Sequence, residues 1–229
     1  MKIQNSVAFV TGGSIGLGAA MVNELLERGA RKVYSASRHP GPAVDARVEV
    51  VRLDVRDPAA VATAAHAASD VSILCNIAGA YLGTPLLTAD LDLVRDELET
   101  NVVGLISMAR AFAPVLAANG GGAMLNVHSL LSWLSAADAY SASRAATWSV
   151  TNGLRALLGP SGTLVTGLHV GFMDTPLTAA YDVPKSDPRD VARSALDGVE
   201  AGADEVLADE DSRSAKQLLS GDPARLVVG

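Results

Sequence analysis

Aromatic and sulfur-containing side chains are scarce in this sequence of 229 residues: Phe, Trp and Tyr make up 4% of it, and Cys75 is the single cysteine. One cysteine can form no disulfide within the chain and cannot build a zinc site from several thiolates. The histidines lie far apart without the spacing of metal ligands, so we expect no metal site. The few aromatic residues predict no obvious surface for recognising a substrate. These absences are typical of a reducing compartment, and we expect a cytoplasmic location.

Charged residues are also few, at 19% of the chain, and the formal net charge of −7 is spread without a long run of one sign. This balance argues against nucleic acid or an anionic membrane surface as a partner. The longest apolar stretch, 101 to 118, is interrupted by Arg110 and Pro114, which argues against a membrane span. Residues 1 to 5 run directly into an apolar strand pattern, without the layout of a signal peptide. A small molecule is therefore the expected partner.

Short β-branched runs alternate with longer Ala- and Leu-rich segments along the chain. The runs predict buried strands at Val7 to Thr11, Lys32 to Ser37, Val48 to Asp54, Ile73 to Asn76, Met124 to His128, Leu164 to Val170 and Glu205 to Ala208. The longer segments predict helices at Gly16 to Arg28, Pro58 to Ala67, Thr88 to Leu116, Ala139 to Leu157 and Pro188 to Ala201. This alternation predicts one domain, 1 to 229, of the doubly wound α/β class, with a mainly parallel sheet and helices on both faces. A charged helix and a loosely ordered tail are expected over about 209 to 229.

A glycine-rich turn, TGGSIGLG, follows the first predicted strand and opens the first predicted helix. Glycines let backbone amides approach a pyrophosphate, and the helix N-terminus adds partial positive charge. Gly12 would form the tight turn, Gly16 would permit the close approach, and Gly18 would let helix and strand pack. Ser14 and Ile15 complete the loop. In this setting the turn predicts a dinucleotide site of the Rossmann type.

The end of the second predicted strand should decide which dinucleotide binds, because an acidic residue there would hold the ribose hydroxyls of NAD. The sequence at this place, Ser35 to His39, has no acid. Arg38 could instead pair with the 2′-phosphate of NADP, with Ser37 beside it. We therefore expect NADP(H), with NAD(H) as the second candidate. The alternative for Arg38 is a solvated surface arginine.

The TGxxxGxG turn and the later Tyr140-Ser-Ala-Ser-Arg144 segment together resemble the short-chain dehydrogenase/reductase family. The resemblance covers nearly the whole chain and implies an oxidoreductase that binds a nicotinamide dinucleotide. It also implies cofactor contacts at Asp54, Val55, Asn76, Ala78, Gly79, Gly171, Met173 and Thr175. The sequence departs from the family pattern at Ile77, where a second asparagine is usual, and at Val170, where proline is usual.

Four residues match the catalytic positions of that family: Ser129, Tyr140, Arg144 and Asn101. Hydride transfer to a carbonyl leaves an alkoxide that needs a proton. The resemblance makes Tyr140 the proton donor, Ser129 the group that binds the substrate oxygen, and Asn101 a support. Arg144 replaces the family's lysine; its fixed charge favours a phenolate, but a guanidinium does not readily give up a proton. The prediction is an NADP(H)-dependent carbonyl reductase or alcohol dehydrogenase.

Arg144 leaves two other functions open. A Ser, Tyr and Arg set is similar to that of the halohydrin dehalogenases, which open or form epoxides without a dinucleotide. Those relatives lack an intact glycine turn, whereas the turn is complete here. The lost lysine and a shortened spacing between Ser129 and Tyr140 would also fit a cofactor-binding sensor or scaffold with little turnover. Family members are commonly dimers or tetramers through their long helices, so we expect a homodimer or homotetramer.

Several ring side chains near these motifs have competing interpretations. His128 adjoins Ser129 but should point to the opposite side of its strand, so we expect it to pack. Trp133 could line the substrate pocket or pack under its loop. Phe172 could flank the nicotinamide or pack, and Tyr181 is a candidate substrate contact in a short loop.

Overall fold

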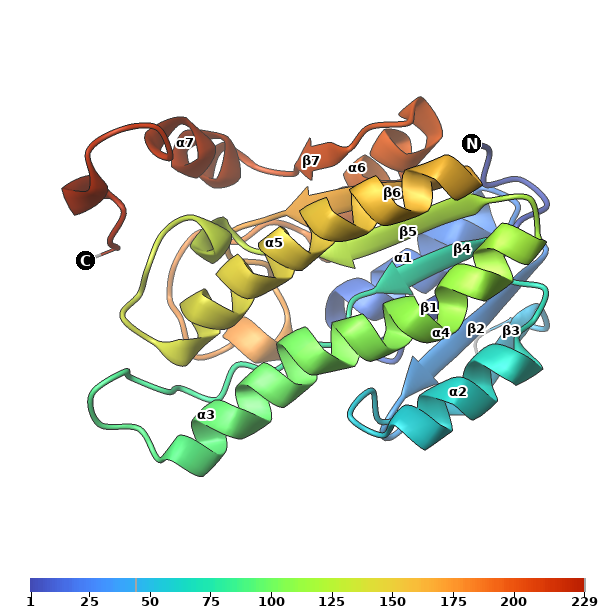
Figure 1. Ribbon diagram of the computed structural model, residues 1–229, viewed down its shortest axis with the longest axis horizontal. Helices are drawn as coiled ribbons and strands as arrows, with labels where there is room; N and C mark the ends of the chain where they lie inside the picture. Colours follow the sequence, from blue (N-terminus) through green and yellow to red (C-terminus); the bar gives the residue numbers. More distant parts are fainter. Residues whose placement is uncertain (44, 229) are drawn as a thin grey trace.

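A seven-stranded parallel sheet forms the centre of the computed structural model, which describes residues 1–43 and 45–228 (Figure 1). The strands are β1 (Val7–Thr11), β2 (Lys32–Ser37), β3 (Val48–Arg52), β4 (Ile73–Asn76), β5 (Gly122–Val127), β6 (Thr163–His169) and β7 (Glu205–Leu207). Their order is β3-β2-β1-β4-β5-β6-β7, and every neighbouring pair is parallel. The predicted doubly wound fold is confirmed. Its strand order reverses between β1 and β4, which is where such sheets bind ligands.

Helices cover both faces of this sheet. They are α1 (Gly16–Glu27), α2 (Pro58–Ala67), α3 (Leu91–Leu98), α4 (Gly104–Ala118), α5 (Ala139–Leu158), α6 (Pro188–Ala201) and α7 (Glu210–Leu218). Figure 1 shows α2, α4 and α5 on one face and α1 and α6 on the other. Along β1, Val7 and Phe9 pack with α2 and α4, whereas Ala8 and Val10 pack with α1 and α6. Burial on both faces explains why β1, VAFVT, is a nearly continuous apolar run.

The helix predicted at Thr88 to Leu116 begins at Leu91 and continues to Ala118, through a π-helical segment, η1 (Glu99–Val103), between α3 and α4. The start is later than predicted because the Asp90 side chain caps the helix by accepting a hydrogen bond from the N–H of Asp92 at 2.8 Å. Residues before the cap form a turn instead.

The whole helix, Leu91–Ala118, is 28 residues long and contains an 18-residue window that is apolar enough to cross a membrane by length and composition. Its buried residues include Met108, Phe112 and Leu116, which pack in the same cluster as the strand residue Phe9. The Phe9 and Phe112 rings lie 4.7 Å apart, centroid to centroid. The apolar stripe of the helix therefore covers one face of the sheet.

The C-terminal segment contacts a loop that is remote in the sequence. After α7 the backbone passes through a 3-10 turn, η5 (Pro223–Arg225), and forms a bridge with a distant loop. The N–H of Ser135 donates to the carbonyl of Leu226 at 2.8 Å, and the N–H of Val228 donates to the carbonyl of Ser135 at 2.9 Å. These bonds tie the segment as far as Val228 to the loop after β5, and the loose order expected for the tail stays a prediction. Gly229 lies outside the described residues.

Candidate active site

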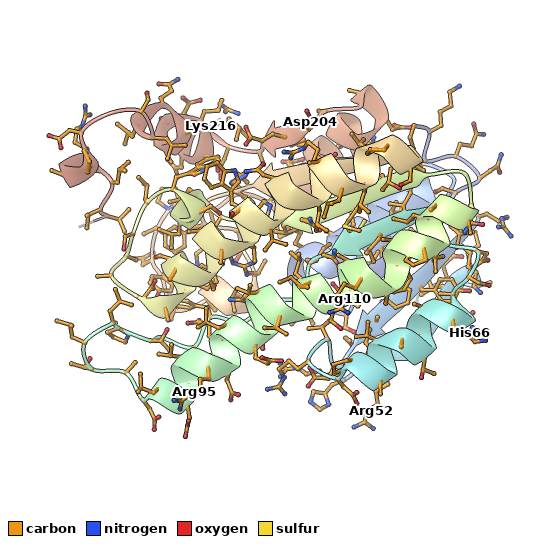
Figure 2. The ribbon with its side chains drawn as sticks, in the orientation of Figure 1. Arg52, His66, Arg95, Arg110, Asp204 and Lys216 are labelled. Atoms are coloured by element: carbon orange, nitrogen blue, oxygen red, sulfur yellow. The ribbon has the colours of Figure 1, made fainter. Side chains whose placement is uncertain are left out.

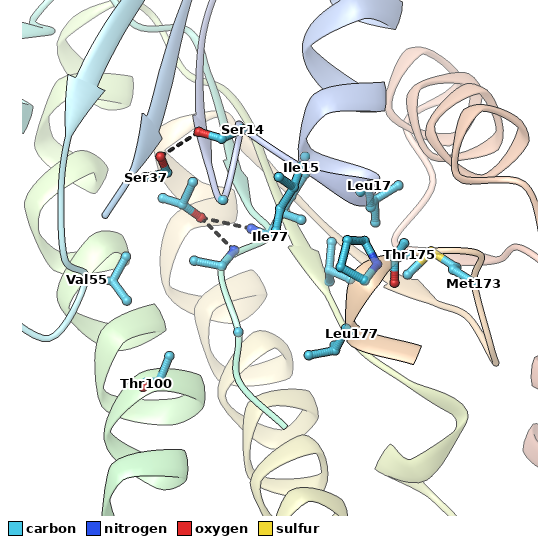
Figure 3. Close-up of a pocket in the computed structure, with 18 of the residues that line it drawn as sticks. Ser14, Ile15, Leu17, Ser37, Val55, Ile77, Thr100, Met173, Thr175 and Leu177 are labelled. Atoms are coloured by element: carbon cyan, nitrogen blue, oxygen red, sulfur yellow. Dashed lines mark hydrogen bonds between the residues drawn. The ribbon is translucent and has the colours of Figure 1, made fainter. Parts of the chain in front are cut away.

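A groove of about 440 Å³ lies at the carboxyl ends of the strands, beside the turn that joins β1 to α1 (Figure 3). Most of the residues singled out from the sequence line it: Gly12, Ser14, Ile15, Gly16, Gly18, Ser37, Arg38, Asp54, Val55, Ala78, Gly79, Ser129, Tyr140, Arg144, Gly171, Met173 and Thr175. Asn76 and Asn101 do not line it. The groove is in the size range of sites for small molecules and cofactors.

The glycine turn has a backbone that other residues would not fit. Gly12 and Gly16 have φ angles of +70° and +53°, in the left-handed region that favours glycine. A Cβ at Gly18 would lie 2.0 Å from the carbonyl oxygen of Gly12, so helix and turn could not approach as they do. Thr11 fixes the turn from the other side, because its hydroxyl accepts hydrogen bonds from the N–H groups of Ile77 and Ala78 at 2.9 and 3.0 Å.

Helix α1 begins at this turn without a side-chain cap. The side chain of its N-cap residue, Ile15, has no hydrogen-bond acceptor, so N–H groups of the first turn are left for a ligand. A helix N-terminus also carries partial positive charge. Ser14 and Ser37 are joined by a hydroxyl hydrogen bond of 2.6 Å across the mouth of the turn, as Figure 3 shows. The arrangement can hold an anion such as a diphosphate.

Arg38 lies at the end of the groove beside Ser37, on the exposed surface that follows β2. Within residues 1–43 and 45–228 it makes no hydrogen bond or ion pair. Asp54 lines the same end, but its carboxylate is bound by the Arg56 guanidinium at 2.7 Å. That hydrogen bond is the main reason why the pKa of Asp54 is lowered. Arg38 is thus the cation at this end that is not already paired with a described carboxylate.

Tyr140 is placed by the start of α5. The carboxylate of Asp138 caps this helix by accepting hydrogen bonds from the N–H and hydroxyl of Ser141 at 2.8 and 2.7 Å. The cap sets the first turn, and with it the phenol, at the edge of the groove. Asp138 is itself buried, with 7% of its surface exposed.

Arg144 lies one helical turn beyond Tyr140, with the guanidinium carbon 4.8 Å from the centroid of the phenol ring. The side chain is 6% exposed, and one guanidinium nitrogen donates to the carbonyl of Val127 at 3.2 Å. Its Nε is buried without a hydrogen-bond partner, and the ion pairs among the described residues do not include it. A buried cation without a carboxylate is costly, and such a charge is well placed to stabilise a developing anion in the groove.

Ser129 follows β5 and is the N-cap residue of η2 (Leu130–Ser132), a 3-10 helix of one turn. Its hydroxyl oxygen accepts a hydrogen bond from the N–H of Leu131 at 3.2 Å. A hydroxyl that accepts one bond still has its own proton to donate. The side chain is therefore oriented by the backbone and can donate to an oxygen atom in the groove.

The two predicted asparagines do not line the groove, and their side chains form hydrogen bonds with residues around it. Asn101 accepts from the N–H of Ala80 at 2.8 Å and donates to the Ala80 carbonyl and the Ser143 hydroxyl, each at 2.9 Å. Asn76 donates to the side-chain oxygen of Asn126 at 2.8 Å. The expected contact of Asn76 with a cofactor is therefore not found in the groove. Asn101 instead ties the strand-end segment to α5 between Tyr140 and Arg144.

Comparison with known proteins identifies the architecture. A family model described as short chain dehydrogenase matches residues 6–185, which include the glycine turn, Ser129 and Tyr140. The chain belongs to the short-chain dehydrogenase family. An uncharacterized oxidoreductase of Staphylococcus aureus (strain N315) is 30% identical over 210 residues, covering 85% of this chain and 90% of that protein. The predicted family is confirmed, and the protein is an oxidoreductase.

Solved structures of short-chain dehydrogenases share this fold with nicotinamide dinucleotides bound. One from Burkholderia cenocepacia J2315, in complex with NADP, is 39% identical with a TM-score of 0.92 and covers 99% of each chain. Another from Burkholderia phymatum, in complex with NAD, is 23% identical with a TM-score of 0.87 and covers 95% of this chain and 94% of that one. The left-handed glycines, the uncapped α1 and the uncompensated Arg144 of the present dehydrogenase fit a dinucleotide of this kind.

Sequence reasoning missed part of this dehydrogenase's site. Thr11, which ties the turn to the β4 end, was not singled out, although a hydroxyl directly before the glycines was a readable signal. Tyr81 was also missed; its ring lies 5.1 Å from that of Tyr140, centroid to centroid. The scarcity of aromatic residues gave no sign that Tyr81, Tyr140, Tyr181 and Phe172 gather in one place.

His128 and His169 form a buried pair next to Ser129. Their ring centroids are 4.9 Å apart, and Nδ1 of His169 lies 3.3 Å from the carbonyl oxygen of Ser129. His128 packs, as expected, with Nδ1 3.3 Å from the Thr147 hydroxyl. Trp133 stacks on His169 at 4.0 Å and is 6% exposed, so it is a core residue rather than a wall of the groove. Burial lowers the pKa of His169 to about 4 and that of His128 well below its usual value.

Lowered histidine pKa values predict a loss of stability in mild acid. The unfolded chain takes up these protons near pH 6.5, whereas the folded state resists them until about pH 4 at His169. Stability from this group is thus complete above pH 6.5 and falls as the pH decreases toward 4. We expect His169 alone to cost about 2 kcal/mol of unfolding free energy between pH 7.5 and pH 5, with His128 adding in the same direction.

Urea unfolding at the two pH values measures this loss. His169→Asn should shrink the pH dependence, whereas His66→Gln, which changes an exposed histidine on α2, should leave it as it is. Equal unfolding free energies of the unmodified protein at pH 7.5 and pH 5 would contradict the assignment.

Proposed function

We propose that this dehydrogenase is NADP(H)-dependent and transfers a hydride between the nicotinamide and a carbonyl compound or secondary alcohol. The observation that carries the proposal is one continuous groove, with a glycine cradle and an uncapped helix at one end and Ser129, Tyr140 and Arg144 at the other. The relative from Burkholderia cenocepacia, solved with NADP, supports the same cofactor. A bound nicotinamide supplies the hydride.

Ser129 would orient the substrate. Because the hydroxyl oxygen already accepts from the Leu131 N–H, its remaining proton is directed to another acceptor. A carbonyl oxygen in the groove is such an acceptor, and it gains negative charge as the carbon is reduced. The hydrogen bond strengthens during the reaction, which is the condition for stabilising a transition state.

Tyr140 would give the proton that the developing alkoxide needs. The phenolate left behind has Arg144 beside its ring, and the guanidinium charge is screened little because the side chain is 6% exposed. Arg144 keeps its protons, so its contribution is charge and position, not proton transfer. The amide of Asn101 is fully engaged with Ala80 and Ser143, so we expect the proton to return to Tyr140 from solvent in the groove.

Arg38 tests the choice of cofactor. Replacing it with alanine should weaken NADPH binding by about 10- to 100-fold, because hydrogen bonds to a charged phosphate are lost, and should change NADH binding little. Fluorescence titration with each nucleotide measures both effects. Arg52→Ala is the matched control, since Arg52 ends the neighbouring strand but does not line the groove and lies at the edge of the molecule (Figure 2). Equal losses for NADPH and NADH in the Arg38 variant would refute a role in reading the phosphate.

The same titrations separate the other functions. Tight nucleotide binding without turnover of carbonyls or alcohols would favour a sensor or scaffold. Binding of halide but of neither nucleotide would favour a dehalogenase. The proposal also includes a cytoplasmic location and self-association as a homodimer or homotetramer, for which exposed apolar residues on the long helices, such as Val103 and Leu157, offer support.

A further inference from the structure

Four aromatic side chains form a continuous arch around the catalytic tyrosine, which we call the aromatic arch: Phe172, Tyr181, Tyr81 and Tyr140. Neighbouring ring centroids along it are 5.2, 6.2 and 5.1 Å apart, and the Tyr81 and Tyr140 rings meet edge to face at 78°. The chain has three Phe, four Tyr and two Trp residues. Nearly half of these aromatic side chains therefore gather in one cluster that reaches Tyr140, the member of the arch that lines the groove.

The arch joins segments that are remote in the sequence. Tyr81 follows β4, Tyr140 begins α5, and Phe172 and Tyr181 follow β6. The hydroxyl groups of Tyr81 and Tyr181 are 2.6 Å apart, across 100 residues of chain. Either hydroxyl can donate to the other, so one phenolic proton of the pair is left over. The pair can therefore give a hydrogen bond to a bound molecule.

The surroundings of Tyr81 favour its neutral phenol. The hydrogen bond with Tyr181 and partial burial raise the pKa of Tyr81, so the phenol stays protonated. The charges of two carboxylates also raise the pKa of Tyr81, and both carboxylates accept hydrogen bonds from other residues. Glu97 is fully buried and accepts bonds from the Leu82 N–H, at 2.8 Å, and from the Thr84 hydroxyl. Asp138 caps α5.

These carboxylates also fix the arch in place. Glu97 anchors the segment directly after Tyr81, and the backbone of Pro85 pairs with that of Asp138 in an isolated bridge. Tyr181 is held by a backbone bond from its N–H to the carbonyl of Thr178 at 3.1 Å. The rings are therefore positioned before a ligand binds, which reduces the entropy cost of binding.

We propose that the aromatic arch determines substrate specificity and selects uncharged aromatic aldehydes and ketones, with the Tyr81 and Tyr181 hydroxyl pair binding a polar substituent of the ring. This inference rests on the proposed reductase function. An aromatic substrate ring would pack edge to face or offset against the arch, as aromatic pairs prefer. A carboxylate beside Phe172, Tyr181 and Tyr81 would lose part of its water, because the Arg144 cation lies at the other end of the arch, beside the Tyr140 ring.

Binding of unreactive ligands tests the arch without turnover. Ligand-observed NMR in the presence of NADP⁺ would compare benzamide, cyclohexanecarboxamide and benzoate. We expect benzamide to bind at least about 5-fold more tightly than either of the others, consistent with the free energy of an aromatic pair. In Phe172→Leu, most of this difference in affinity between benzamide and cyclohexanecarboxamide should be lost. Equal binding of benzamide and benzoate, or an unchanged preference in Phe172→Leu, would overturn the proposal.

Kinetics test the hydroxyl pair. Tyr181→Phe keeps the ring and removes one hydroxyl, so kcat/KM with NADPH should fall by about 10-fold more for 3-hydroxybenzaldehyde, which is neutral at pH 7, than for benzaldehyde. Tyr34→Phe is the matched control. It removes the hydroxyl of Tyr34, the third residue of β2, which donates to Asp70, and it should leave both values equal to those of the unmodified protein. Equal losses for the two aldehydes, or none, would refute the role of the pair.

The two proposals fail in different ways. If no carbonyl is reduced with either nucleotide, the proposed reductase function is wrong, while benzamide binding still reports on the arch. If aldehydes are reduced but benzamide and cyclohexanecarboxamide bind equally tightly in all variants, the proposed reductase function is retained and the arch does not determine specificity.

Discussion

Tyr140→Phe should lower kcat/KM for carbonyl reduction by about 10²- to 10⁴-fold, the usual contribution of a positioned general acid. The phenylalanine ring keeps the contact with Tyr81 and the face that packs against Arg144, so the groove should keep its shape. Only the transferable proton is lost. The Kd for NADPH should therefore stay within about twofold.

Single-turnover kinetics with pre-bound NADPH measure the loss at the chemical step, and fluorescence titration measures nucleotide affinity. Tyr34→Phe is the matched control, because it removes a phenolic hydroxyl that bonds Asp70 at 2.9 Å and does not line the groove. Activity of Tyr140→Phe equal to that of the unmodified enzyme would remove Tyr140 from the assigned role. A parallel loss of nucleotide binding would point to a packing role instead.

Gly18→Ala should have the second large effect, and it should act on binding and stability together. The new Cβ would lie 2.0 Å from the Gly12 carbonyl oxygen and 2.5 Å from its carbon, both backbone atoms that cannot rotate away. The turn and the start of α1 must separate, which costs about 1–3 kcal/mol of stability. The amides that would hold a diphosphate move with them, so NADPH binding should weaken by about 100-fold or more.

Gly153→Ala is the matched control for this prediction. Gly153 lies inside α5, where an added Cβ meets nothing within 4 Å. Alanine is the better helix former, so this change should stabilise the protein by about 0.5–1 kcal/mol and leave nucleotide binding unaltered. Thermal unfolding and fluorescence titration of both variants give the comparison. Normal NADPH affinity in Gly18→Ala would show that the turn does not cradle the cofactor.

The sequence was most informative where backbone conformation decides the structure. The TGGSIGLG spacing predicted the turn between β1 and α1 because the glycines are needed for the φ angles and the close approach seen there. The central strands β1 and β4 are buried on both faces and nearly all apolar, and the predicted strand positions were correct within a few residues. β3 ends at Arg52, before the predicted Asp54, because the chain turns where Asp54 accepts a hydrogen bond from the Arg56 N–H at 3.0 Å.

The sequence was least informative where contacts between distant segments orient a side chain. Asn101 was placed on the right helix, but its amide turns to Ala80 and Ser143. Tyr81 and Tyr181 meet only because β4 and β6 end at the same edge of the sheet, and no local pattern predicts that meeting. Likewise, no local pattern predicts that the C-terminal tail forms hydrogen bonds with Ser135, which belongs to a different loop.

The proposed function requires that the groove bring a nicotinamide and a carbonyl together so that a hydride passes between them. The most direct measurement is reduction of benzaldehyde by NADPH carrying deuterium at C4 of the nicotinamide, with each of the two C4 stereoisomers used in turn and mass spectrometry of the benzyl alcohol formed. One stereoisomer should give alcohol with a single deuterium on the carbinol carbon, and the other should give unlabelled alcohol. Absence of label from both, or no alcohol at all from benzaldehyde and from a panel of other ketones and aldehydes, would contradict the account.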